Sequence, residues 1–123
     1  MTTVQGQFCW NELQTTDTNK AKEFYGNLLG WTFHDHNTPN MQYTMIKVDG
    51  KDIGGIMACP SNDKKVPPHW MSYINVIDLN STVKKAQELG GILQVPPTEV
   101  PDMGSFALIQ DPTGAYIAFW QTK

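Results

Sequence analysis

The sequence contains the same order of elements twice, and this internal repeat constrains its fold more than any other feature. The helix-start residues Asp17 and Asp78 lie 61 positions apart, and the helix-stop residues Gly30 and Gly91 are separated by the same 61 positions. Apolar residues between each pair recur at helical spacing. Because a repeated unit can bury its apolar face against its own copy, the spacing predicts two similar modules.

Each module is predicted to run strand, helix, strand, strand, strand. The first helix ends at Gly30, and Asp49-Gly50 predicts a hairpin turn between two of the strands. Strands are expected at 8–13, 31–36, 42–48, 52–58, 70–76, 92–95, 106–110 and 115–121. We place module one at about 6–62, a linker at 62–68 and module two at about 69–123, all within one domain 1–123.

The composition excludes several classes of protein. A chain of 123 residues with 40% hydrophobic and 17% charged residues is typical of one globular core. A net charge of -3 provides no positive field for a phosphate backbone, so nucleic acid is not expected as a partner. There is no long apolar run, and two cysteines are too few for a disulfide framework, so we expect a cytoplasmic protein without membrane contact.

Short motifs follow one another along both modules. They are Trp10-x-Glu12-Leu13, Asp17-x3-Ala21-x2-Phe24-Tyr25-x2-Leu28-x-Gly30-Trp31, Gly54-Gly-Ile-Met57, His69-Trp70-x2-Tyr73, Leu89-Gly-Gly91, Asp111-Pro-x-Gly-Ala115 and Phe119-Trp-Gln121. In their order and spacing the chain resembles the vicinal oxygen chelate superfamily, which includes glyoxalase I, bleomycin-resistance proteins and extradiol dioxygenases. The resemblance implies an α+β fold of two βαβββ modules forming a curved mixed sheet around a cavity, with the helices outside.

The resemblance also implies where metal ligands would stand. In metal-dependent members, four ligands come from the first and last strand of each module; on this chain those positions fall on Trp10, residues 55–57, Ser72 and Ala118. An indole only donates a hydrogen bond and a methyl group cannot bind a cation, so we expect no metal and no other cofactor. Glu12 would share a strand face with Trp10, either as a rim carboxylate or as a ligand contact.

Aromatic residues on the predicted strands are expected to line a cavity suited to a planar or hydrophobic small molecule. Polar side chains among them would orient that ligand. The residues expected to bind it are Trp10, Glu12, Tyr43, Trp70, Ser72, Tyr73, Phe106, Tyr116, Ala118 and Trp120.

The histidines and cysteines give further, weaker signals. His34 and His36 would share a strand face, but no clear third ligand accompanies them, and we interpret the pair as a solvated strand end. His69 is either a general base at the pocket mouth or an anchor of the linker, which leaves Glu12 and His69 as the catalytic candidates. Cys9 is expected to be a small buried hydrophobe.

These observations favour a metal-independent small-molecule-binding protein of the glyoxalase/bleomycin-resistance type. The alternative is a lyase, isomerase or dioxygenase-like enzyme of the same superfamily, and a third interpretation is a partner-binding module with a collapsed cavity. Because open sheet edges must be paired or covered, we also expect a homodimer.

Overall fold

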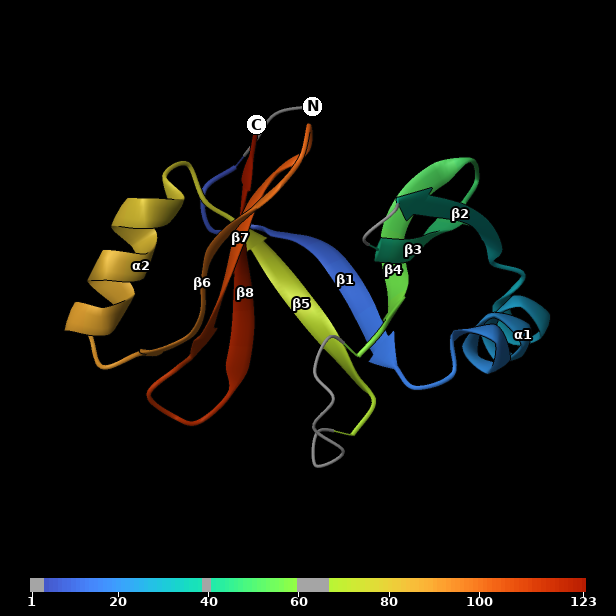
Figure 1. The fold of residues 1–123 in the computed structure, drawn as a ribbon, viewed down its shortest axis with the longest axis horizontal. Coiled ribbons are helices and arrows are strands. Elements are labelled where there is room, and N and C mark those ends of the chain that lie inside the picture. Colours follow the sequence, from blue (N-terminus) through green and yellow to red (C-terminus); the bar gives the residue numbers. More distant parts are fainter. Residues whose placement is uncertain (1–3, 39–40, 60–66) are drawn as a thin grey trace. The chain divides into compact units, whose positions relative to one another are not determined.

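The computed structural model describes residues 4–38, 41–59 and 67–123. These residues form two helices and eight strands (Figure 1). In chain order they are β1 (Phe8–Thr15), α1 (Thr18–Leu29), β2 (Thr32–Thr38), β3 (Met41–Val48), β4 (Lys51–Ala58), β5 (His69–Asn75), α2 (Leu79–Glu88), β6 (Ile92–Val100), β7 (Gly104–Gln110) and β8 (Tyr116–Thr122). The predicted βαβββ repeat and the α+β fold class are confirmed.

The chain divides into two compact units. One contains residues 10–71 and is called the α1 unit; the other contains residues 72–123 together with the segment up to residue 9 and is called the α2 unit. Most of the predicted linker at 62–68 lies outside the described residues. The module bounds at about 6–62 and 69–123, and a cavity enclosed by both modules, stay predictions.

The α1 unit has a four-stranded mixed sheet in the order β2-β3-β4-β1, in which β1 runs parallel to β4 and the other pairs are antiparallel. Asp17 begins α1 because its carboxylate accepts the backbone N–H of Lys20 at 2.9 Å. The core is formed by Leu13, Ile46 and Ile56, and side chains of α1, including Tyr25, pack against it. One face of the sheet is therefore covered by the helix.

The α2 unit repeats this plan in the order β5-β8-β7-β6, with β5 parallel to β8. Asp78 begins α2 by accepting the backbone N–H of Ser81 at 3.2 Å. The helix packs along β6, β7 and β8, as Figure 1 shows for α2 and β6. Its core consists of Val76, Leu79, Val83, Ala107 and Ile109.

The N-terminal segment also belongs to the α2 unit. The N–H of Gly6 donates to the carbonyl of Asn75 at 2.8 Å, and the N–H of Asn75 donates to the carbonyl of Gln7 at 2.8 Å. The thiol of Cys9 contacts the carbonyl of Tyr73 at 3.5 Å. These contacts join the start of the chain to β5.

The Asp49-Gly50 hairpin is confirmed between β3 and β4. Both residues have positive φ, 52° at Asp49 and 74° at Gly50, which suits the turn that follows the right-handed twist of the strands. Within the described residues, neither helix has the length and apolar character needed to cross a membrane.

Candidate functional site

The α1 unit has one sheet face turned away from its helix. Successive residues on a strand point to opposite faces, and Leu13, Ile46 and Ile56 point to the core beneath α1. Glu12 is paired with Gly55 and so lies on the opposite face, which we call the helix-free face. Trp10 and Tyr43 have the same phase on their strands, and the contacts between them and around Gly55 agree with this placement.

Trp10 and Tyr43 are joined on the helix-free face. The indole N–H of Trp10 donates to the hydroxyl oxygen of Tyr43 at 2.8 Å, although the two residues are 33 positions apart. The Tyr43 ring lies directly over Gly55, so closely that a Cβ at that position would overlap it. A glycine in β4 thus leaves the space that the Tyr43 ring occupies where its hydroxyl group reaches Trp10.

A carboxylate accompanies these aromatic rings. Glu12 is only 5% exposed, which is unusual for an ionisable side chain, and the amide nitrogen of Gln14 donates to its Oε2 atom at 2.9 Å. The two residues share a face because they are two positions apart on β1. Glu12 can accept a hydrogen bond from a ligand or a proton from an acidic C–H group.

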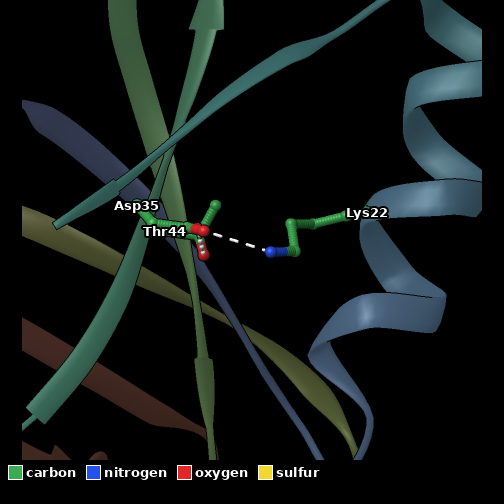
Figure 2. Close-up of polar contacts among 3 residues, drawn as sticks. All are labelled: Lys22, Asp35 and Thr44. Carbon is green, nitrogen blue, oxygen red and sulfur yellow. Dashed lines mark hydrogen bonds and ion pairs between the residues drawn. The ribbon is translucent and has the colours of Figure 1, made fainter. Parts of the chain in front are cut away.

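The opposite face of the same sheet carries a polar contact that fixes how β2 is oriented (Figure 2). The hydroxyl of Thr44 donates to Oδ1 of Asp35 at 2.7 Å, and the ammonium group of Lys22 on α1 lies 3.4 Å from the same oxygen. The Thr44 hydrogen bond holds the pKa of Asp35 below its ordinary value, and Lys22 acts in the same direction. Asp35 therefore points towards α1.

The α2 unit has a helix-free face of its own. Pairing places Tyr73 beside Ala118, and Phe106 beside Trp120, on the face opposite the core of α2. The rings of Tyr73 and Phe106 meet edge to face, with centroids 6.4 Å apart. Tyr116 has the same strand phase as Ala118 but is exposed. The α2 unit thus brings these residues together on one sheet face, and their contact with a ligand stays a prediction.

Three predicted site residues lie elsewhere. Trp70 is 41% exposed and packs against Tyr25 of α1, with its indole N–H 3.4 Å from the Tyr25 hydroxyl oxygen. Ser72 is out of phase with Tyr73 and thus lies on the other face of β5. The Nδ1 atom of His69 is 2.9 Å from the carbonyl of Pro67, so the ring contacts the segment before β5. Their roles in binding or catalysis stay predictions.

The implied metal does not fit the residues at the expected positions. The indole N–H of Trp10 is donated to Tyr43, and Ala118 is buried and offers a methyl group. In residues 4–38, 41–59 and 67–123, no group of three or more His, Cys, Asp or Glu side chains could hold a metal ion. We derive no chemistry through a metal at these positions, and the metal-free interpretation stays a prediction.

Sequence reasoning missed Gln14 and the glycine beneath Tyr43. Gln14 could have been found, because it is two residues from Glu12 on a predicted strand and shares its face. The role of Gly55 depends on how β3 and β4 pair, and a single sequence gives no signal for that register.

Three comparisons relate this chain to known proteins. The family model described as Glyoxalase/Bleomycin resistance protein/Dioxygenase superfamily matches residues 7–119. The chain is 37% identical over 122 residues to "Putative glyoxylase CFP32" of Mycobacterium tuberculosis, covering 97% of this chain and 47% of that protein. It is 28% identical over 129 residues to "Anthracycline biosynthesis protein DauV" of Streptomyces sp. strain C5, covering 94% of this chain and 47% of that protein. The chain therefore spans about half the length of these curated relatives.

Solved structures share the fold at low sequence identity. The crystal structure of methylmalonyl-CoA epimerase from Mycobacterium tuberculosis matches with a TM-score of 0.71 and 16% identity, covering 100% of this chain and 93% of that one. A hypothetical protein, BH1468 from Bacillus halodurans, matches with a TM-score of 0.75 and 12% identity, covering 98% of this chain and 96% of that one. Likeness at this level of identity concerns the fold alone.

Proposed function

Because the chain belongs to the glyoxalase/bleomycin resistance protein/dioxygenase superfamily, we propose that it binds a small organic ligand without a metal, on the helix-free face of the α1 unit. One observation carries the proposal: the Trp10–Tyr43 pair, held by a 2.8 Å hydrogen bond, lies on the same face as the buried carboxylate of Glu12. Flat aromatic rings beside one oriented polar group are typical of small-molecule sites.

The proposed ligand is planar and carries a hydrogen-bond donor. The Tyr43 ring packs against Gly55 on the helix-free face, and a planar molecule can stack on an aromatic ring of this kind. Glu12, oriented by the amide of Gln14, accepts a hydrogen bond from the ligand. A relative is named for anthracycline biosynthesis, which makes a hydroxylated anthraquinone a reasonable first probe.

The alternative is an isomerase or lyase in which Glu12 acts as a general base. Its low exposure and its contact with Gln14 favour it for this role over an ordinary surface carboxylate. Several solved structures that share the fold are named methylmalonyl-CoA epimerase, and an isomerase of this kind is the class of enzyme meant here. In D₂O, the unaltered chain should then exchange an acidic C–H group of its ligand for deuterium, and Glu12→Gln should not. This result would favour the alternative over binding alone.

A homodimer is part of the proposal. β2 and β6 are edge strands within their own units, and edge strands need a cover. The exposed side chains of Phe24, Leu28 and Leu29 on α1 provide an apolar surface for a two-fold contact. The partner is a second copy of this chain in the cytoplasm.

Ligand titration of untagged protein tests the binding site. Trp10→Ala should weaken binding of the anthraquinone probe by about 5- to 150-fold, equivalent to about 1 to 3 kcal/mol for a buried aromatic contact. Trp31→Ala is the matched control, because Trp31 stacks on Tyr25 of α1 and packs against the core beneath that helix, not on the helix-free face. Equal losses in both variants, or none in Trp10→Ala, would contradict the proposed site.

A further inference from the structure

The edge strand β2 presents two histidines on one face. His34 and His36 are two residues apart on the strand, which places their Cα atoms about 6.5 to 7 Å apart on the same side of the sheet. Both side chains are exposed. Imidazole side chains at this spacing can lean together and share one small ion.

The orientation of this face follows from Asp35, the residue between them. Asp35 accepts a hydrogen bond from Thr44 and lies 3.4 Å from Lys22, so it points towards α1 (Figure 2). Phe33, which has the same phase, packs with the core beneath the helix. His34 and His36 therefore point to the helix-free face, away from that carboxylate.

The surroundings of the two rings decide which ion suits them. On β3, the direct partner of His34 is Met45 and that of His36 is Tyr43, so neither partner supplies a carboxylate. Lys47, further along β3, is held in an ion pair with Asp52 at 2.8 Å. Mg²⁺ and Ca²⁺ require oxygen ligands, whereas imidazole nitrogen suits Cu²⁺, Ni²⁺ and Zn²⁺.

We propose that His34 and His36 form a two-histidine site for a divalent transition-metal ion, with Cu²⁺ bound most tightly. Two protein ligands leave the remaining coordination positions to water or a small molecule. The site needs two side chains, so it agrees with the absence, in the described part of the chain, of any group of three or more His, Cys, Asp or Glu side chains that could hold a metal ion. It is separate from the implied metal positions, and it lies beside the proposed ligand site on the same face, because His36 is the strand partner of Tyr43.

Calorimetric titration of untagged protein with CuCl₂, NiCl₂, ZnCl₂ and MgCl₂ tests the site. We expect one Cu²⁺ per chain, weaker binding of Ni²⁺ and Zn²⁺, and none of Mg²⁺. His34→Asn and His36→Asn should each weaken Cu²⁺ binding at least about tenfold, as expected when a metal site loses a ligand.

The chain contains its own controls. Its remaining histidine, His69, contacts the carbonyl of Pro67, so His69→Asn should bind Cu²⁺ as the unaltered chain does. Asp35→Asn should do the same, because Asp35 points to α1. Retention of Cu²⁺ by both His34→Asn and His36→Asn, or equal loss in His69→Asn, would refute the site.

A measurement on the unaltered chain avoids any question of folding in the variants. Zn²⁺ should shift the imidazole NMR signals of His34 and His36 and leave those of His69 in place. A shift confined to His69, or shared equally by all three rings, would overturn the proposal. Metal binding and anthraquinone binding are measured in separate titrations of the unaltered chain, so either proposal can fail while the other holds.

Discussion

The contact between Tyr43 and Gly55 makes the sharpest prediction for the helix-free face. A Cβ added at Gly55 would overlap the Tyr43 ring, which is a side chain and can turn away. The Trp10–Tyr43 hydrogen bond would then break, at a cost of about 0.5 to 1.5 kcal/mol. Alanine in place of glycine also lowers the conformational entropy of the unfolded chain, which stabilises the fold by about 0.4 to 1 kcal/mol and offsets part of that cost. We expect Gly55→Ala to change the free energy of unfolding by no more than about 1 kcal/mol.

The neighbouring glycine supplies the contrast. A Cβ at Gly54 would overlap the backbone carbonyl oxygen of Asn11 on β1, and a paired strand cannot turn away as a side chain can. We expect Gly54→Ala to destabilise the fold by about 1 to 3 kcal/mol, as overpacking does in protein cores. Urea unfolding of the two variants measures both values.

The NMR signals of the indole N–H groups test the reasoning directly. The chain has four tryptophans, so four such signals are expected, and Trp10→Phe identifies the one from Trp10. Tyr43→Phe and Gly55→Ala should both move that signal, because both remove the same hydrogen bond, while the other three stay in place. An unmoved Trp10 signal in Gly55→Ala, or equal destabilisation by the two alanine variants, would refute the reasoning.

Three further predictions concern stability, reactivity and assembly. The Thr113 hydroxyl and nearby backbone N–H groups hold the pKa of Asp111 below its ordinary value. The carboxylate therefore stabilises the fold above its unfolded pKa of about 3.9, and this contribution is lost as the pH falls through the lower pKa of the folded state. The difference in Tm between Asp111→Asn and the unaltered chain should shrink from pH 7 to about pH 3. Burial raises the pKa of Cys9, so iodoacetamide at pH 7 should modify it more slowly than a free cysteine, as mass spectrometry would show; an equal rate would contradict this. Light scattering at micromolar concentration should give about twice 13.8 kDa, and Leu28→Asp should lower that mass; a monomer throughout would refute the dimer.

The sequence predicted features that depend on neighbouring residues better than features that depend on strand pairing. Asp17 and Asp78 each accept a backbone N–H three residues ahead, so helix starts can be recognised from the local sequence. The sequence also predicted that Trp10 and Glu12 share one face of their strand, because they are two positions apart. The sequence did not predict the position of Trp70 beside Tyr25, because this position depends on a contact with a residue 45 positions away.

The same limit applies to the histidine pair. Their shared face follows from the two-residue spacing, but which face it is depends on Lys22 and Thr44, which hold Asp35 towards α1. The order and class of the elements are thus available from one sequence. The partners of a side chain on the sheet require the register between strands.

The pairing of the first residues with β5 has a consequence for the order in which the chain folds. Gly6 and Gln7 bond to Asn75, so the α2 unit closes only after nearly seventy intervening residues have been made. During synthesis Gly6 and Gln7 are made long before Asn75, their partner in β5. In the α1 unit, every strand except β1 is paired with a strand that is its neighbour in the sequence. Contacts of such long sequence separation slow folding. The α1 unit is therefore expected to gain structure first, and the return of the N-terminal segment to β5 to be among the last steps.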